Sequence, residues 1–257
     1  MTLLINYANA EFRKSQQLNS QTGRDVGKFD EVISYSPQDI DTEFRERNKH
    51  ILKQVKGNGY WLWKPYFIHR ALQQLRDGDI LFYSDSGAYF SADVAPLTDL
   101  LDRSGRDLVV FELQQIEKHW TKRDAFILMD CDTPEFTDSK QRLATFSIWR
   151  KSKFTMDLIE EYLELAQDER LITDLENQCG QPNDPEFKNH RHDQSIFSLL
   201  SKKHGIEAHR DPSQWGDDVR DLYPNSPYPS VIHSTRASHP SLFRKLVNKV
   251  KKRLNKK

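Results

Sequence analysis

The stretch ILFYSDSG, residues 80–87, carries the strongest structural signal in this chain of 257 residues. Its apolar run ends abruptly in the carboxylate of Asp85, and a short apolar run bounded by turn residues is typical of a buried strand. In open α/β sheets, ligands bind in the crevice beyond the carboxyl ends of the strands. We therefore expect Asp85 to lie at such an edge, where a carboxylate can hold a divalent cation. An ordinary turn at the end of a strand is the alternative.

The same pattern of buried strands and amphipathic helices extends outward from this stretch in both directions. Apolar runs predict further strands at residues 3–5, 29–35, 108–111, 144–149 and 231–233. Periodic apolar residues predict helices within 37–52, 65–75, 156–165 and 192–200, whereas the polar sequence between 9 and 27 carries no predicted element. Alternating strands and helices indicate an α/β fold whose central sheet is mixed, mostly parallel and flanked by helices.

Length and composition favour a single domain that does not span a membrane. The chain is long enough for one large α/β domain, and no run approaches the roughly 20 apolar residues that a spanning helix needs. The first residues lack the basic flank and cleavage site of a signal peptide, which predicts a cytoplasmic protein. Cys131 and Cys179 stand far apart without metal-ligand spacing, so we expect neither a disulfide framework nor a zinc site.

The C-terminal segment 241–257 contains eight basic residues and no acid, although the formal net charge of the whole chain is zero. Its apolar residues recur at helical spacing, which predicts a basic amphipathic helix suited to an anionic membrane surface. Peripheral binding to the inner face of the membrane is therefore a hypothesis, and a solvated or disordered tail is the equal alternative. Nucleic acid is not an expected partner, because the aromatic residues lie elsewhere in the sequence.

Two further segments combine aromatic and polar side chains: GYWLWKPY at 59–66 and HRHDQS at 190–195. Together with the first strand and the strand that ends at Asp85, they resemble small bacterial and viral glycosyltransferases of the GT-A type, in order over most of the chain. The resemblance implies one GT-A-like domain over residues 1–240, with a Rossmann-like half that binds a nucleotide-sugar donor. It also implies a glycan or lipid-linked acceptor, and Mn²⁺ or Mg²⁺ bridging the donor diphosphate.

The cation site of that family has an Asp-x-Asp signature at a strand end. By resemblance, Asp85 is the first acid, while Gly87 stands where the second acid is expected. His233 resembles the histidine that completes the coordination, and imidazole and carboxylate are both suitable ligands for Mn²⁺. A partly buried structural histidine is the equal alternative. A literal Asp-x-Asp occurs at residues 130–132, but its second acid precedes a helix start and is expected to be a structural cap.

The helix that begins near residue 193 carries the expected catalytic groups. By resemblance, Asp193 and Gln194 face the sugar and the acceptor hydroxyl. His192 belongs to the polar cluster around them and is expected to contact substrate, and the charge of Arg236 suits it to neutralise phosphate. A carboxylate at this place can remove the proton of the acceptor, or it can orient the donor and stabilise oxocarbenium charge. The alternative for Asp193 is an acid favoured by the helix dipole, and for Arg236 a solvated surface side chain.

The remaining substrate-binding candidates lie in the aromatic block and on two strands. Lys64 is expected to contact the diphosphate or sugar of the donor, because an ammonium group suits phosphate as a point charge. Trp61 and Trp63 alternate about one residue, so an extended segment would place both on one face as a wall for a sugar; packing against a helix is the equal alternative. The resemblance assigns Tyr7 to the nucleotide base and Gln141 to the donor pocket.

Two other classes of function compete with a transferase. A metal-dependent hydrolase would use the same carboxylate to activate water, but it would require a second acidic ligand near Asp85, and the adjoining sequence offers none. A carbohydrate-binding or scaffold protein would use the tryptophans to hold sugar while the acids serve the structure. Binding of nucleoside diphosphates with and without Mn²⁺ separates the three classes.

Overall fold

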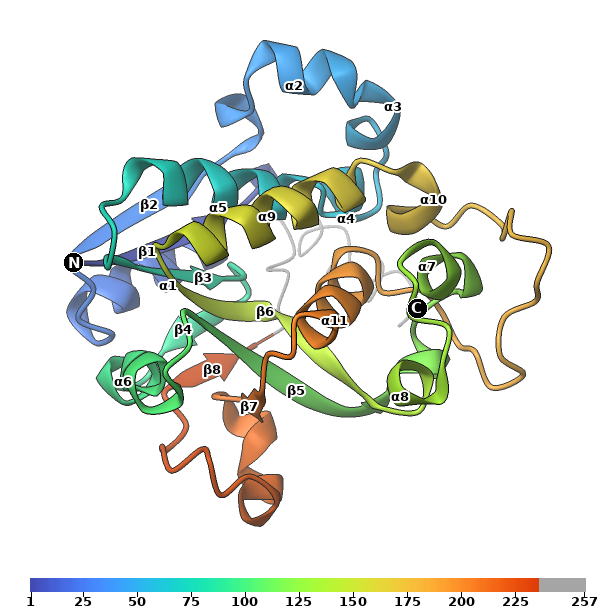
Figure 1. Ribbon diagram of the computed structural model, residues 1–257. Helices are drawn as coiled ribbons and strands as arrows, with labels where there is room; N and C mark the ends of the chain where they lie inside the picture. The colour runs from blue at the N-terminus through green and yellow to red at the C-terminus, as the bar shows by residue number, and fades with distance from the viewer. Residues whose placement is uncertain (236–257) are drawn as a thin grey trace, which may run out of the picture.

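The computed structural model describes residues 1–235, which form an α/β unit around a twisted sheet (Figure 1). The strands are β1 (Thr2–Tyr7), β2 (Glu31–Tyr35), β3 (Ile80–Ser84), β4 (Ala88–Phe90), β5 (Leu108–Ile116), β6 (Lys140–Arg150), β7 (Ala208–Arg210) and β8 (Ile232–Ser234). The longer helices are α1 (Arg13–Asp25), α5 (Trp63–Gln74), α6 (Ala95–Ser104), α9 (Lys153–Ala166) and α11 (Asp193–Lys203). The short helices and 3₁₀ turns are η1 (Ala10–Phe12), η2 (Pro37–Asp39), α2 (Thr42–Arg47), α3 (Lys49–Leu52), α4 (Gly57–Tyr60), η3 (Glu117–His119), α7 (Arg123–Leu128), α8 (Pro134–Thr137), α10 (Glu169–Ile172) and η4 (Gln214–Leu222).

The main sheet has the strand order β2-β1-β3-β6-β5-β7. The pairs β1/β2, β1/β3 and β5/β7 are parallel, whereas β6 is antiparallel to both β3 and β5. Five strands of this sheet therefore run in one direction, and β6 alone runs the other way. Because the carboxyl ends of parallel strands lie at the same edge, the segments that follow β1, β3, β5 and β7 meet there.

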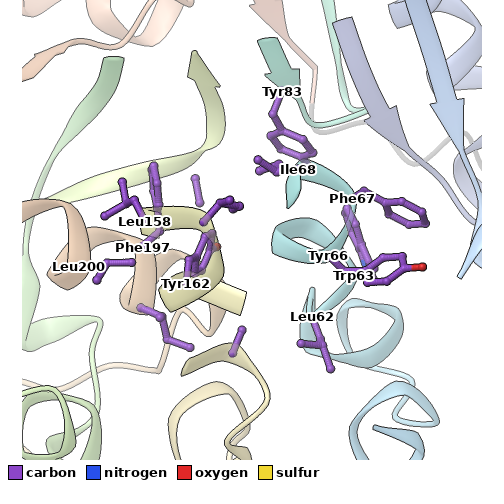
Figure 2. Close-up of a cluster of buried hydrophobic side chains, with 14 of the residues drawn as sticks. Leu62, Trp63, Tyr66, Phe67, Ile68, Tyr83, Leu158, Tyr162, Phe197 and Leu200 are labelled. Carbon is purple, nitrogen blue, oxygen red and sulfur yellow. The ribbon is translucent and has the colours of Figure 1, made fainter. Parts of the chain in front are cut away.

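Side chains alternate between two apolar layers, one on each face of the sheet, as the two-residue period of a strand requires. On one face, Leu3, Leu81 and Trp149 join the helices α5, α9 and α11, and on the other face Leu4 and Phe82 join α6 and β8. Figure 1 shows α5 and α9 side by side over the first face, and Figure 2 shows the aromatic side chains of α5, α9 and α11 in that layer.

The strands predicted in the first two-thirds of the sequence are confirmed, as are the α/β class and the mostly parallel sheet. The predicted closing strand at 231–233 is β8, but it pairs with β4 in a separate two-stranded sheet. The polar stretch 13–25, for which no element was predicted, is helix α1. Its buried residues are Ser15, Gln16, Asn19, Ser20 and Gly23, so the inner face of α1 has no apolar periodicity to detect.

The described residues contain no helix long and apolar enough to cross a bilayer. Both cysteines are free thiols, Cys131 buried and Cys179 partly exposed. Arg236 and the segment 241–257 lie outside the described residues, so the division of the chain at residue 240 remains a prediction.

Candidate active site

A cavity of about 860 Å³ opens at the carboxyl edge of the main sheet. The segments after β1 and β3, the end of β5 and the segment after β7 all contribute to its wall, as the sheet direction requires. The start of α11, the segment 55–64 and residues Leu143, Thr145 and Phe146 of β6 also line it. Of the predicted site residues, the cavity is lined by Tyr7, Trp61, Trp63, Lys64, Asp85, His192, Asp193 and Gln194.

Asp85 directly follows β3, and its side chain remains 31% exposed at the cavity wall. The buried Tyr83 hydroxyl donates a hydrogen bond to Asp85 Oδ1. The turn after the strand is held from behind by Asn19 of α1, whose Nδ2 donates to Ser84 Oγ and to the Ala88 carbonyl, both at 3.0 Å. Asn19 is fully buried, but the adjacent Leu18 is exposed and no apolar periodicity marks this face, so sequence reasoning did not identify Asn19.

Lys64 lies between two carboxylates. Its Nζ is 2.6 Å from Asp193 Oδ2 and 3.5 Å from Asp85 Oδ1, and it donates a hydrogen bond of 3.1 Å to the Ala144 carbonyl. Its side chain is only 4% exposed. Burial alone would lower the pKa of Lys64, but the carboxylates of Asp193 and Asp85 outweigh it and raise the pKa, so the amine stays protonated. One ammonium group therefore joins the strand-end acid to the acid at the start of α11.

Asp193 is the first residue of α11 and is almost fully buried. Burial raises the pKa of its carboxyl to about 6, although the Lys64 ammonium pulls the value down. The Tyr162 hydroxyl donates a 3.0 Å hydrogen bond to the Asp193 carbonyl, which fixes the start of the helix against α9. A carboxyl group with a pKa near 6 can exchange a proton close to neutral pH.

The orientation of the Gln194 amide follows from the buried carboxylate of Glu117, to which it is linked through Gln141. A carboxylate accepts hydrogen bonds and has none to donate, so Gln141 places its Nε2 against Glu117 and donates to Oε1 at 2.9 Å. Gln141 Oε1 is thereby free to accept from Gln194 Nε2 at 2.8 Å, and Gln194 Oε1 accepts from the Ala144 N–H at 3.3 Å. Gln141 itself is fully buried behind Gln194 and is not among the described residues that line the cavity.

Tyr7 and Trp63 form a stacked pair in the wall after β1, with ring centroids 3.8 Å apart. The Tyr7 hydroxyl accepts a hydrogen bond from Asn58, and Trp63 Nε1 donates to the Gly57 carbonyl at 3.0 Å. Residues 57–61 all have positive φ, between 51° and 94°, so this segment is a left-handed turn. Left-handed backbone costs roughly 1–2 kcal/mol for each residue other than glycine, and such strain collects at functional sites.

His192 adds a second strained position, in contact with the left-handed turn. Its φ is 54° and its ψ is −121°, and its ring stacks on Trp61 with centroids 5.4 Å apart. Nδ1 donates to the Ile172 carbonyl at 2.8 Å, and burial lowers the pKa of the ring to about 4. His192 is therefore neutral at physiological pH and braces Trp61 rather than supplying positive charge to a phosphate.

The structure places His233 on β8 with its ring against Tyr89, centroids 5.1 Å apart. Within residues 1–235, the lining of the cavity includes the neighbouring Ser234 but not His233. Gly87 lies in the wall beside Asp85, and a Cβ built on it would meet no atom within 4 Å. Asp85 is thus the one carboxylate of the predicted cation site that the described chain offers to the cavity.

Asp85 alone is too small a ligand set for a divalent cation, so the remaining ligands would have to come from substrate and water. Lys64 and Tyr83 already contact Asp85 Oδ1, which leaves Oδ2 of the same carboxylate for a metal ion. Mg²⁺ is commonly held by one or two carboxylates together with substrate phosphates and water. Asp85 can supply the protein ligand of such an arrangement.

Another group of metal-ligand type lies outside the cavity. The ligand atoms of His119, Asp184 and Glu186 fall within 4.8 Å of one another. The Lys118 ammonium is 3.9 Å from the Asp184 carboxylate and competes with a cation for it.

The literal Asp-x-Asp at residues 130–132 does not line the large cavity either. The prediction that its second acid caps a helix is wrong: Thr133 is the N-cap of α8, and the Asp132 carboxylate instead accepts a 2.8 Å hydrogen bond from Arg123. A guanidinium within reach on the preceding helix turn offers this carboxylate a charged donor, which is stronger than a backbone N–H.

Two solved structures share the architecture of this chain. Xyloside xylosyltransferase 1 from mouse superposes with a TM-score of 0.50 at 11% sequence identity, covering 93% of this chain and 99% of that chain. The galactosyltransferase LgtC, solved with donor and acceptor sugar analogues, superposes with a TM-score of 0.52 at 12% identity, covering 92% of this chain and 87% of that chain. No family model and no curated protein sequence matches the chain. The two likenesses establish a shared fold, and they confirm the GT-A-like fold expected from the sequence.

Proposed function

We propose that this chain is a glycosyltransferase that moves a sugar from a nucleotide-diphosphate donor to a hydroxyl group of a glycan or lipid-linked acceptor. The observation that carries the proposal is the position of Lys64, whose ammonium group joins Asp85 and Asp193 in a large cavity at the carboxyl edge of the sheet. That edge is where ligands bind in open α/β folds. The shared fold of two glycosyltransferases supports the same conclusion.

The diphosphate of the donor is assigned to the neighbourhood of Asp85 and Lys64. A divalent cation bound between Asp85 and the diphosphate would neutralise the charge of the leaving group. Lys64 contributes a fixed positive charge beside the same carboxylate, in a place from which water is largely excluded. The stacked Tyr7 and Trp63 rings offer an aromatic wall after β1 for the nucleotide base.

Asp193 and Gln194 are assigned to the reacting sugar and the acceptor. With a pKa of about 6, Asp193 can accept the proton of an acceptor hydroxyl near neutral pH if the reaction inverts configuration. If the reaction retains configuration, the same carboxylate can stabilise positive charge that develops on the sugar. Gln194 keeps one amide N–H for substrate, because its other bonds to Gln141 and Ala144 fix the direction of the amide.

The basic segment 241–257 is assigned to an anionic membrane surface that carries the acceptor. Basic residues near such a surface contribute about 1 kcal/mol each, which makes eight of them sufficient for peripheral binding. Deletion of the residues after Ser241 should release the protein from vesicles that contain phosphatidylserine. Unchanged sedimentation of the truncated protein with those vesicles would contradict the assignment.

The test of function is titration calorimetry of the full chain with UDP, GDP and CMP, each with and without Mn²⁺, followed by a panel of nucleotide sugars. We expect one nucleotide to bind, and Asp85→Asn to weaken its binding at least tenfold. Asp25→Asn is the matched control, because Asp25 is an exposed helical aspartate outside the cavity. A bound nucleotide also raises the free energy of unfolding, and the increase grows with the logarithm of the nucleotide concentration divided by its dissociation constant.

The competing functions give different results in the same experiment. A hydrolase would release phosphate or sugar to water as the main reaction without an acceptor. Asp193 is a second acid near Asp85, but Lys64 stands between the two carboxylates, where a shared metal ion would have to bind. A carbohydrate-binding or scaffold protein would show no response to any nucleotide, and that outcome would remove the transferase proposal.

A further inference from the structure

The five tryptophans of this chain all lie among the described residues, and four of them are engaged by other side chains or buried. These four are Trp61 stacked on His192, Trp63 stacked on Tyr7, Trp120 beneath the guanidinium of Arg191, and Trp149 in the core. The fifth, Trp215, is 62% exposed and lines the cavity. Within residues 1–235, no ring packs on its indole and no hydrogen bond reaches its Nε1.

The backbone that carries Trp215 is nevertheless firmly held. Gln214 and Ser234 form a reciprocal pair, with Gln214 Nε2 donating to the Ser234 carbonyl at 2.7 Å and the Ser234 N–H donating to Gln214 Oε1 at 2.9 Å. Ser213 is the N-cap of η4 and forms an isolated β-bridge with Ile232. A Cβ at Gly216 would collide with the Asp211 carbonyl, so the chain passes its neighbour closely at this point. The indole is therefore presented by a rigid segment rather than by a loose loop.

An exposed tryptophan on a rigid support leaves a large apolar surface in water, and this surface is stabilised once a flat apolar ligand covers it. The end of β5 contributes three polar side chains to the same cavity, Glu112, Gln114 and Gln115, together with the apolar Leu113. An indole face bordered by carboxylate and amide groups suits a pyranose, whose C–H face packs on the ring while its hydroxyls bind the rim. The Tyr223 hydroxyl already bonds Glu112 Oε1 and Gln114 Nε2, and a lipid chain would cover their remaining polar atoms and the Gln115 amide without offering hydrogen bonds.

Trp215 and the nucleotide wall belong to different segments that line the same cavity. Tyr7 and Trp63 lie after β1, whereas Trp215 follows β7, and β3, β6 and β5 stand between these two strands. Gln214, the neighbour of Trp215, pairs with Ser234, and Ser234 lies opposite Ala88 in the β4/β8 sheet. The segment that carries the indole is therefore fixed beside the turn that follows Asp85, rather than on the wall after β1.

We propose that Trp215 is the platform for a sugar ring of the acceptor, so that the acceptor is a glycan of at least one pyranose unit. The assignment to the acceptor rests on the transferase function proposed above, whereas the sugar-binding role of the indole does not.

The experiment is glycan-array binding of the full-length protein, followed by titration calorimetry with the oligosaccharide that is retained most strongly. Three proteins are compared: wild type, Trp215→Ala and Trp215→Phe. We expect the alanine variant to bind that oligosaccharide at least tenfold more weakly and the phenylalanine variant to keep part of the affinity. Leu128→Ala is the matched control, because Leu128 is a large exposed apolar residue outside the cavity. Thermal shifts with UDP, GDP and CMP are measured in parallel and should be equal in all variants.

Each outcome bears on one proposal or the other. Equal glycan binding by wild type and Trp215→Ala, or no glycan retained by the wild type, overturns the platform. Binding to phosphatidylcholine vesicles that depends on Trp215, without any bound glycan, assigns the indole to lipid and also overturns it. Glycan binding that depends on Trp215 in a protein without any nucleotide response keeps the sugar-binding role of Trp215, while it removes the transferase function and with it the acceptor assignment.

Discussion

Lys64 places a single ammonium group between two carboxylates with almost no water around it. Replacing one partner of a buried ion pair by an apolar residue typically costs 3–5 kcal/mol, because the other charge is left buried without compensation. We therefore expect Lys64→Met to lower the free energy of unfolding by about 3 kcal/mol in urea titrations.

A second substitution separates this effect from simple loss of packing. Asp193→Asn in the Lys64→Met background should recover much of the stability, because the buried carboxylate is then removed while the remaining carboxylate, Asp85, is 31% exposed to water. The control is Lys153→Met, which removes an exposed pair with Asp157 on α9 and should change the stability by less than about 0.5 kcal/mol. Equal losses in the Lys64 and Lys153 variants would contradict the buried ion pair.

Asp193 also predicts a pH dependence with a definite sign. Its pKa is raised to about 6 in the folded protein, so between pH 4 and pH 6 the folded state binds more protons than the unfolded state. Stability contributed by this group is therefore present at low pH and is lost as the pH rises through 6, by an amount on the order of 1–3 kcal/mol. The difference in unfolding free energy between wild type and Asp193→Asn, measured from pH 4 to pH 7, should decrease over this window. A flat difference would contradict the raised pKa.

Gly87 offers a gain-of-function test at the scale of one residue. Because the space beside its Cα is open, Gly87→Asp should fold normally and place a second carboxylate next to Asp85. Two carboxylates bind a hard cation more tightly than one, so the affinity for Mn²⁺ should rise at least tenfold by calorimetry. Gly205→Asp adds a carboxylate at another open glycine outside the cavity and is the control for Mn²⁺ affinity; its φ of 62° adds a left-handed backbone cost that residue 87 does not carry. Equal Mn²⁺ affinity in the two variants would show that residue 87 does not face the cation.

At the scale of elements, the left-handed turn at residues 57–61 couples the aromatic block to the site. Gly57→Ala should destabilise the protein more than Gly105→Ala, although both positions have φ near 60°. Both variants pay the left-handed backbone cost of roughly 1 kcal/mol, but only at residue 57 would the added Cβ overlap the ring of Trp61. The measurement is the difference in unfolding free energy between the two variants. If they are equally stable, the ring of Trp61 does not pack on this turn.

Helix α1 shows why one element escaped prediction. Period-based reasoning identifies a helix by its apolar face, but α1 buries amides, hydroxyls and a glycine. These buried polar groups are satisfied by hydrogen bonds to distant segments: Asn19 bonds Ser84, and Gln16 bonds the Tyr35 carbonyl. Hydrogen-bond partners across the fold leave no trace in local sequence periodicity. The strand that precedes Asp85 was predictable for the opposite reason, because its apolar run is continuous and local.

At the scale of the whole molecule, the cavity wall is assembled from segments spread over most of the described chain. A bound nucleoside diphosphate should therefore slow amide hydrogen exchange in several distant segments at once, including 7–12, 55–64, 85–87 and 191–194. Helix α6 lies outside the cavity and serves as the internal control. Protection restricted to one of these segments would contradict a single shared site. The measurement is exchange mass spectrometry at saturating nucleotide.

The sequence by itself determined the five strands β1, β2, β3, β5 and β6 of the main sheet, the helices α5, α9 and α11, that Asp85 ends a strand, and that Asp193 opens a helix. These features depend on side-chain periodicity and turn residues close together in the chain. Only the tertiary structure decided that Lys64 joins both acids, that Gln141 stands behind Gln194, that His233 packs on Tyr89 and that Trp215 is left without a ring partner. Each of these facts depends on which side chains of distant segments meet when the strands align. That alignment is set by packing of the whole core, which no local pattern encodes.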